Sequence, residues 1–214
     1  MAPEIDRLTP GTQIGDYLLT ALLYDGPTTR TWEAQQISID REVIVDSLNW
    51  DQQQDENFVA TFLSDVRTKA AIDHPLIGSV FQAVQNERHC FFAREKLSGT
   101  SLQQLHDVQT SLTPFCVAHI LRQSAEANLY LEKHQLNSLP LQADQIFISD
   151  QSHCRFVNIA VGGERDPNNA TADKHTLATT LLPMLQGNLP GSTRTQSLLD
   201  FMADLEREHP LSWE

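Results

Sequence analysis

The sequence predicts an α+β protein in which a mainly antiparallel β half precedes a mainly helical half. Three observations predict this class. Short runs rich in β-branched and aromatic residues, which are typical of strands, follow one another as far as residue 97. One segment, at 55–71, interrupts them with apolar side chains at helical spacing. Beyond Ser98-Gly99-Thr100 the longer segments have helical spacing instead.

The β half is expected to be a five-stranded meander with one inserted helix. A turn at Asp25-Gly26-Pro27 separates the first two strands, because Gly26 accepts a positive φ and Pro27 presets its own φ. The inserted helix begins at Asp55, where a negative charge favours the helix dipole, and it ends before Pro75. The expected strands cover 16–24, 29–37, 42–48, 77–84 and 89–97.

The second half is expected to contain four helices and one strand pair. Thr113 is the N-cap of the longest helix, and Pro114 takes its first position, where a missing N–H costs nothing. The strand pair turns at 150–152, and the polar stretch 162–170 is expected to be a loop. The helices are expected at 101–109, 114–134, 173–186 and 195–208, and the strands at 145–149 and 154–159.

The domain organisation expected from these elements is one domain with two lobes. Residues 1–15 are polar and contain two prolines and two glycines, so they are expected to form a loose N-terminal arm. Residues 16–97 are expected to form the β-rich lobe, and residues 98–214 the mainly helical lobe.

The charge balance restricts the classes of function. The chain of 214 residues has 15 Lys and Arg against 28 Asp and Glu, which gives a formal net charge of −13. This balance argues against nucleic-acid binding, which needs clustered cations to displace counterions from phosphates. It also disfavours binding to anionic membrane surfaces. We therefore expect neither a nucleic acid nor a lipid surface as the partner.

Other common chemistries have no matching residue pattern. The three cysteines, Cys90, Cys116 and Cys154, form no CxxC pair, which is typical of a reducing compartment. The eight histidines form neither an HxxH nor an HExxH motif, so no metal site is expected. The chain has no apolar run of the length that spans a membrane, and its first residues lack the apolar core of a signal peptide. We expect no membrane insertion in this segment.

Six segments occur in an order that is familiar from one family. They are IGDYLLTALLYDG, REVIVDSL, FLSDVRTKAAIDHPLI, FFAREKLSGTSLQQL, ILRQSAEANLYLEKHQL and DQIFISDQSHCRFVNIAV. Their collinear order resembles the catalytic domain of bacterial eukaryotic-type serine/threonine protein kinases, from about Asp16 to Pro210. The resemblance implies a kinase-like two-lobe fold, with a five-stranded antiparallel N-lobe that holds one helix and a reduced, mainly helical C-lobe. The alternative is a new α+β domain whose apolar pattern imitates this order.

The resemblance also implies where nucleotide chemistry would lie in the N-lobe. A kinase covers the phosphates of ATP with a glycine-rich turn and binds them with a lysine. The glycines of that turn fall on Tyr24, Gly26 and Thr29, so only Gly26 remains. The lysine falls on Asp46, which places a negative charge where the phosphates would lie.

Two further N-lobe positions concern the same chemistry. The glutamate that holds the lysine falls on Asp65, so the usual ion pair becomes two carboxylates. These diverge, share a proton or are separated by Arg67, and we favour divergence with Asp65 on a solvated helix face. The position before the hinge residue Glu95 falls on Arg94. We expect Arg94 either to pair with Asp46 or Asp65 or to point to solvent.

The cations that could reach a phosphate limit any nucleotide binding. No lysine occurs in the turn or in the strands beside it, so Arg30, Arg41 and Arg94 compete for this role. We expect Arg30 and Arg41 to be solvated residues at strand edges. Gly26, Arg94 and Glu95 are therefore interpreted as vestiges of a nucleotide site, and no cofactor is expected.

The catalytic base and the metal ligands of the C-lobe also fall on unsuitable residues. The H-R-D triplet falls on Ser138-Leu139-Pro140, so Pro140 replaces the base and lacks a backbone N–H. The nearest carboxylate, Asp144, falls on a variable position of the family. The two magnesium ligands fall on Gln145 and Asn158, so neither position keeps the residue that holds the metal.

These substitutions predict a pseudokinase. The stretch 159–172 is too short for an activation segment, and 188–194 leaves no room for the helix that docks substrates. We expect a catalytically inactive kinase-like module that acts through protein contacts as a scaffold or regulator. One alternative is a divergent domain whose cleft still binds a nucleotide or another small ligand, and another is a structural domain of a larger assembly.

The acidic balance and the cysteine pattern lead to expectations about partner and location. We expect a protein partner with a basic surface, which contacts the helix at 55–71 or the loop at 164–166. We expect a cytoplasmic location, either for the chain alone or as the cytoplasmic part of a longer membrane-anchored protein.

Overall fold

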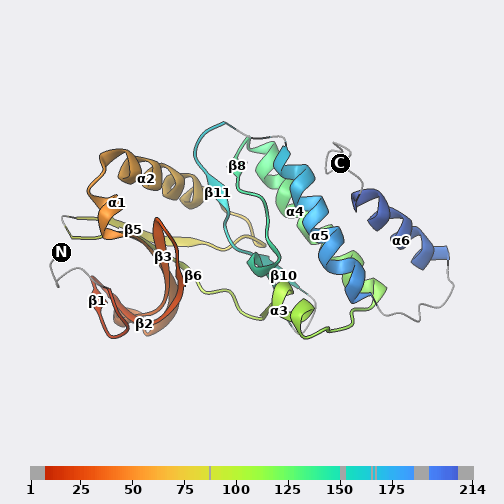
Figure 1. The fold of residues 1–214 in the computed structure, drawn as a ribbon, viewed down its shortest axis with the longest axis horizontal. Helices are drawn as coiled ribbons and strands as arrows, with labels where there is room; N and C mark the ends of the chain where they lie inside the picture. Colours follow the sequence, from red (N-terminus) through yellow and green to blue (C-terminus); the bar gives the residue numbers. More distant parts are fainter. Residues whose placement is uncertain are drawn as a thin grey trace. The chain divides into compact units, whose positions relative to one another are not determined.

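The structure is a computed structural model that describes residues 8–86, 88–149, 153–164, 166, 168–185 and 193–206. The chain divides into two compact units, each of which is drawn in Figure 1. The first unit consists of Met1–Ile72 and Gly78–Lys96, and the second consists of Asp73–Ile77 and Leu97–Glu214.

The first unit is built on one antiparallel sheet, which curls in Figure 1, with the strand order β1-β2-β3-β4-β6-β5. The five long strands are those that the sequence predicts, and a short 3-10 turn, η2 (Ile37–Ile39), links β3 to β4. The strands are β1 (Gln13–Ile14), β2 (Tyr17–Asp25), β3 (Thr29–Gln36), β4 (Arg41–Leu48), β5 (Val80–Gln85) and β6 (Cys90–Glu95).

One face of this sheet carries the core of the first unit. Alternate residues of a strand point to opposite faces, so Trp32 and Ala34 of β3 are buried together, as are Val43 and Val45 of β4. Trp32 lies opposite Val45 in the ladder, which brings the two rows into contact. The other members of the core are Ile14, Tyr17, Leu19, Phe91 and Ala93.

The N-terminal segment differs from the loose arm that we expected. Within the described residues 8–15, strand β1 pairs with β2, and Ile14 is only 1% exposed. The backbone N–H of Leu19 donates to the carbonyl of Thr12 at 2.9 Å. The expectation was wrong for 8–15, because one buried side chain among polar neighbours has no periodicity that reveals it. Residues 1–7 lie outside the described residues.

Two helices complete the first unit, α1 (Trp50–Gln53) and α2 (Glu56–Ala70). Asp55 caps α2 by accepting a hydrogen bond from the N–H of Asn57 at 2.8 Å, and the helix buries Val66. Helix α1 was not expected, because one turn of helix is too short to show helical spacing.

The second unit is mainly helical, and α5 contacts both α4 and α6 (Figure 1). Two small antiparallel sheets accompany the helices, with the orders β10-β9-β7 and β11-β8. The elements are β7 (Thr100–Ser101), α3 (Leu102–Asp107), α4 (Pro114–Lys133), β8 (Asn137–Ser138), η3 (Ala143–Gln145), β9 (Ile146–Ile148), β10 (Cys154–Phe156), β11 (Ala160–Val161), α5 (Asn168–Met184) and α6 (Thr193–Glu206).

Helix α4 begins where its capping residues predict. The hydroxyl of Thr113 accepts a hydrogen bond from the N–H of Cys116 at 3.2 Å, and Pro114 takes the first position of the helix. The helix buries one apolar face, which includes Val117 and Ile120.

In the described part of the chain, no helix combines the length and apolarity that crossing a membrane requires.

Two expected boundaries in the second unit differ from the structure. Helix α5 begins at Asn168 and not at 173, so the end of the stretch 162–170 is helical and the loop expectation was wrong there. Asp166 caps this start by accepting a hydrogen bond from the N–H of Asn168 at 2.9 Å. The polar first turn of α5 has no apolar periodicity that could predict it. The expected turn at 150–152 lies outside the described residues.

A substitution in β1 tests whether the N-terminal segment belongs to the sheet. Ile14→Ala is expected to lower the free energy of unfolding by about 2–4 kcal/mol, because it leaves a cavity in the core. Gln13→Ala, on the exposed face of the same strand, is expected to change it by less than about 0.5 kcal/mol. Urea denaturation measures both values. Equally small losses from the two variants would mean that β1 is not part of the folded sheet.

Candidate functional site

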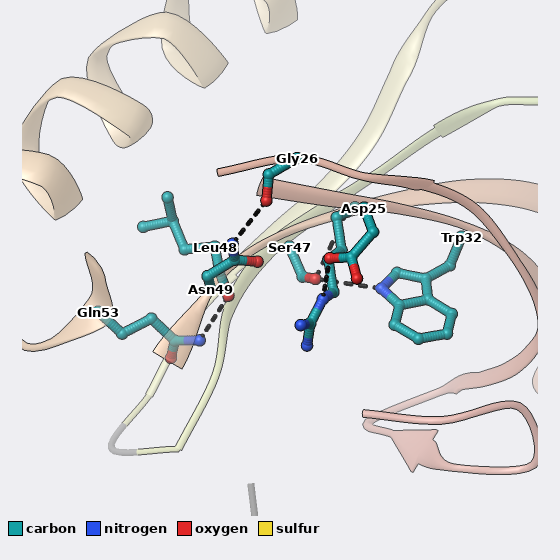
Figure 2. A network of polar contacts seen from close by, with 8 residues as sticks. Asp25, Gly26, Trp32, Ser47, Leu48, Asn49 and Gln53 are labelled. Atoms are coloured by element: carbon teal, nitrogen blue, oxygen red, sulfur yellow. Dashed lines mark hydrogen bonds and ion pairs between the residues drawn. The ribbon is translucent and has the colours of Figure 1, made fainter. Parts of the chain in front are cut away.

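The turn between β2 and β3 is held by hydrogen bonds from the residues that follow β4 (Figure 2). The side-chain amide of Asn49 donates to the carbonyl of Gly26 at 2.9 Å. The backbone N–H of Asn49 donates to the carbonyl of Thr28, also at 2.9 Å. Gln53 extends the network by donating to the carbonyl of Leu48 at 2.8 Å. These bonds fix the turn against the end of β4.

Gly26 is enclosed within this turn. Its N–H donates to the carbonyl of Thr29 at 3.0 Å, while its own carbonyl accepts the bond from Asn49. A Cβ atom at Gly26 would lie 2.4 Å from the ring of Tyr24 and 2.9 Å from the Thr29 oxygen, so a larger residue does not fit. The backbone donor of Gly26 is therefore used inside the turn and is not directed at a ligand.

Strand β4 places Asp46 beside Arg94 of β6. Arg94 Nε lies 2.6 Å from Asp46 Oδ2, and the Asp46 and Arg94 side chains are 14% and 16% exposed. The hydroxyl of Thr31, which lies opposite Asp46 on β3, donates to Asp46 Oδ1 at 2.5 Å. Both carboxylate oxygens therefore have partners. The expected Arg94–carboxylate pair is confirmed with Asp46 as its acid, and the alternative in which Arg94 points to solvent is wrong.

Helix α2 brings two more charges into this environment. Burial lowers the pKa of Lys69 from 10.5 to about 8. The carboxylates of Asp65 and Asp46 oppose this shift, and the Arg94 guanidinium adds to it. Asp65 is half-buried one turn before Lys69, so the expectation of a solvated position for Asp65 was wrong. The cation near Asp46 and Asp65 is Lys69. Arg67, which we considered for this place, is exposed.

Lys69 is the residue of this cluster that the sequence analysis missed. A kinase carries its phosphate-binding lysine on a strand, and Lys69 lies on α2. The spacing of Asp65 and Lys69 is a signal that could have found it, because residues four apart on a helix are neighbours.

The other two candidate cations are also engaged by the protein. Arg30 Nε lies 2.6 Å from Asp25 Oδ1. The guanidinium carbon of Arg41 lies 3.6 Å from the centroid of the Phe81 ring, and Arg41 Nη2 donates to Gln36 Oε1 at 2.8 Å. Both arginines are partly exposed, and each has a partner in its own unit.

Glu95 closes the end of β6 against the residue that precedes β5. Its N–H donates to the carbonyl of Ser79 at 2.9 Å, and its Oε2 accepts from the N–H of Ser79 at 3.2 Å. The backbone and side chain of Glu95 are therefore both bonded to Ser79.

In the second unit, backbone pairing holds the segment that was matched to the catalytic loop. Ser138 lies opposite Ala160 in the β8–β11 pair, and the N–H of Leu139 donates to the carbonyl of Ile159 at 3.0 Å. Pro140 follows and is half-buried. The position matched to the catalytic base is therefore a residue without a proton-transferring group, directly after a strand pair.

Gln145 and Asn158 lie on neighbouring stretches of backbone. The N–H of Val157 donates to the carbonyl of Gln145 at 2.9 Å. Gln145 Oε1 accepts from the N–H of Gln142 at 2.9 Å, which is part of a capping box around η3. Asn158 is 4% exposed, and its Oδ1 accepts from the N–H of Ala160 at 3.3 Å. Each amide oxygen is therefore used in a local backbone contact.

Asp173 of α5 supports the same segment from within the unit. Its Oδ1 accepts from the N–H of Leu141 at 2.6 Å, and the residue is 1% exposed. Burial raises the pKa of Asp173 to about 6, while the bond from Leu141 and the charge of Lys174 oppose the rise. Asp144, the nearest carboxylate to Pro140 in the sequence, is exposed.

The structure thus gathers the predicted site residues in two groups, each within one unit. Asp46, Asp65 and Arg94 belong to the first unit, and Gln145 and Asn158 to the second. Over the ranges that the structure describes, no three His, Cys, Asp or Glu side chains are placed to hold a metal ion.

Comparison with known proteins shows kinase relatives, although no family model matches the chain. Over 147 residues, or 69% of its length, the chain is 20% identical to the serine/threonine-protein kinase PrkC of Bacillus subtilis. Over 145 residues, or 68%, it is 21% identical to PknL of Mycobacterium tuberculosis. Over 126 residues, or 58%, it is 28% identical to pkn3 of Myxococcus xanthus. The chain is a homologue of bacterial serine/threonine protein kinases.

A solved structure, the kinase domain of Mycobacterium tuberculosis PknI, has a similar fold to this chain. It matches with a TM-score of 0.63 at 15% identity, over 95% of this chain and 92% of that chain. The predicted kinase-like α+β fold is therefore confirmed. The matched region spans 23% of PrkC, 36% of PknL and 23% of pkn3, so the chain corresponds to a small part of each relative.

The Asp46–Arg94 pair can be tested by removing one partner and then both. Arg94→Met is expected to lower the free energy of unfolding by about 2–4 kcal/mol, because Asp46 keeps a mostly buried charge without its cation. The double variant Asp46→Asn/Arg94→Met is expected to recover most of this loss, since no unpaired charge remains. Chemical denaturation of the three proteins measures the coupling.

The control is Arg122→Met, which removes an exposed ion pair with Glu126 and is expected to cost less than about 1 kcal/mol. A loss from Arg94→Met no larger than that of the control would contradict the importance of the Asp46–Arg94 pair.

Proposed function

We propose that the chain is a catalytically inactive kinase-like module that acts through protein contacts as a scaffold or regulator. The proposal assigns to Asp46 the position of the nucleotide-binding lysine and to Pro140 that of the catalytic base. It assigns the two magnesium-ligand positions to Gln145 and Asn158. Phosphoryl transfer depends on positioning ATP and Mg²⁺ with these groups, so their joint replacement removes the means of catalysis.

The observation that carries the proposal is the engagement of the candidate phosphate-binding cations. Arg30 pairs with Asp25, and Arg94 pairs with Asp46. Arg41 stacks on the ring of Phe81. A phosphate would have to compete with a carboxylate for Arg30 and Arg94, and it would meet the repulsion of the same carboxylate. The enclosed N–H of Gly26 supports the proposal, because it removes a backbone donor from the turn.

A second candidate function is favoured by Lys69. This side chain lies in the same electrostatic environment as Asp46 and Arg94, and it comes from α2 and not from the strands. It is the cation that would serve a cleft that still binds a nucleotide or another anionic ligand. On this alternative, binding would depend on Lys69 and would not depend on Arg94.

ATP binding distinguishes the two candidates. We expect no change in melting temperature at millimolar ATP with Mg²⁺ or Mn²⁺, because the engaged cations and Asp46 disfavour the phosphates. A ligand at about 100 times its Kd would stabilise the fold by about 2.7 kcal/mol, which thermal denaturation detects easily. An active bacterial kinase domain provides the positive control.

A clear rise in melting temperature would refute the inactive-module proposal as far as nucleotide binding is concerned. The same measurement on Lys69→Met would then show whether Lys69 carries the binding. Arg122→Met, on an exposed face of α4, is the matched control for loss of one positive charge.

The acidic surface is the proposed means of partner recognition. The net charge of −13 favours a basic protein surface, in the cytoplasm, as the partner. The faces proposed for contact are α2, where Glu56 is exposed, and the stretch around Glu164 and Asp166, which are also exposed. The alternative is that these acids only keep the protein soluble.

The salt dependence of association tests this recognition. With the partner that a pull-down from the native cell identifies, the association rate is expected to fall steeply as salt rises from about 0.1 M to about 1 M, since the screening length shortens from about 10 Å to about 3 Å. Glu56→Gln and Glu164→Gln are each expected to slow association at low salt. Asp144→Asn changes the net charge equally elsewhere and is expected to have less effect. A rate that stays constant across this salt range would rule out the acidic surface as the recognition element.

A further inference from the structure

Two histidines contact the ring of Tyr130 on α4 in the second unit. The His74 and Tyr130 ring centroids are 4.7 Å apart, and those of Tyr130 and His134 are 4.2 Å apart. His74 belongs to the segment Asp73–Ile77, which follows α2 in the sequence and is grouped with the second unit. The hydroxyl of Tyr130 accepts a hydrogen bond from the N–H of Asp73 at 3.2 Å. The stack therefore attaches this segment to α4.

The Nδ1 atoms of the two histidines have opposite roles. Nδ1 of His74 lies 3.3 Å from the N–H of Leu76, which can only donate, so this nitrogen is an unprotonated acceptor. Nδ1 of His134 lies 2.8 Å from the carbonyl of Tyr130, which can only accept, so this nitrogen carries a proton. A second proton on His134 would enter at Nε2 and leave its bond intact. A second proton on His74 would enter at Nδ1 when Nε2–H is present, and the bond from Leu76 would be lost.

The bond to His74 belongs to a short chain of backbone contacts. The N–H of Ile77 donates to the carbonyl of His74 at 3.1 Å, and the N–H of Phe156 donates to the carbonyl of Leu76 at 2.7 Å. Ile77 also forms an isolated parallel bridge with Phe156. Loss of the acceptor at His74 therefore affects the turn that presents Leu76 and Ile77 to β10.

We propose that His74 is a proton-sensitive clasp, which holds the segment Asp73–Ile77 on α4 and β10 while its imidazole is neutral and loosens it when the imidazole is protonated. His134, which also contacts the Tyr130 ring, is not part of the switch. This inference is independent of whether the chain binds a nucleotide or a protein partner.

The groups around His74 determine the direction of the response. On α4, Glu126 favours the charged imidazole, and the rings of Tyr130 and His134 also face this region. On β10 the contact is made by Phe156, which does not titrate. Burial is the larger effect and lowers the pKa of His74 from 6.5. Because the folded pKa of His74 is lower than the unfolded one, the stabilisation is complete above the unfolded pKa and is lost as pH falls from that value through the folded pKa.

The test is amide hydrogen exchange of the whole chain, followed by NMR and expressed as protection factors that correct for the intrinsic effect of pH. Between about pH 7.5 and about pH 5.5, on either side of the ordinary histidine pKa, the protection of the Leu76 and Phe156 amides is expected to fall several-fold. The limit for one proton is about tenfold per pH unit. His74→Asn should abolish this dependence, because its Oδ1 can accept from the N–H two residues later and does not titrate.

His134→Asn is the matched control, since it removes the other imidazole that contacts Tyr130, which is not bonded to the Leu76 amide, and it should keep the pH dependence of the wild type. Constant protection in the wild type, or an equal fall in His74→Asn, would overturn the proposal. If His74→Asn does not fold, the proposal is tested on the wild type alone, by following the NMR signals of the Leu76 amide and the His74 ring as pH is lowered. The Leu76 amide and the His74 ring must then shift at the same pH, and separate midpoints would refute the clasp.

Discussion

The charge of Asp46 is the constraint on which the arrangement of the first unit depends. A carboxylate that is only 14% exposed is costly unless its oxygens have partners, and β4 carries it in the middle of the sheet. Three other elements of the unit, β3, β6 and α2, each supply a hydrogen-bond partner or a compensating charge. Thr31 on β3 donates to one oxygen and Arg94 on β6 to the other. Lys69 on α2 lies within the field of the pair, and its lowered pKa reflects the burial of a cation at this place.

This charge cluster separates what a kinase-like fold needs from what kinase chemistry needs. The sheet forms because Trp32, Val43, Val45 and Phe91 are buried on one face, and this apolar set does not depend on the charge at position 46. Phosphate binding, in contrast, depends on the sign of a few side chains at that place. A homologue can therefore keep the fold of PknI at 15% identity while its polar residues form internal ion pairs.

Elements with a long apolar period could be predicted from the sequence, whereas elements made by single contacts could not. The five long strands and α4 were expected near their observed bounds because β-branched and aromatic residues run through the strands and apolar residues recur at helical spacing in α4. Strand β1 and the β8–β11 pair have two residues each, and they exist through pairing with distant segments. The Asp46–Arg94 pair could be predicted because both residues were matched to family positions. Lys69 could not be found in this way, since its role depends on how α2 packs on the sheet.

The polar residues that were matched to kinase positions are satisfied differently in the two units. In the first unit, Asp46, the residue matched to the kinase lysine, forms a side-chain ion pair with Arg94. In the second unit, the residues matched to the base and the metal ligands use their polar atoms in contacts with the backbone. Gln145 bonds to Gln142, Asn158 bonds to Ala160, and the backbone beside Pro140 pairs with β11. Because Asn158 is 4% exposed, a carboxylate introduced there would be buried next to a backbone that already has its partners. On the proposed assignment of these positions, phosphoryl transfer would need a rearranged backbone in the second unit as well as a reversed charge in the first.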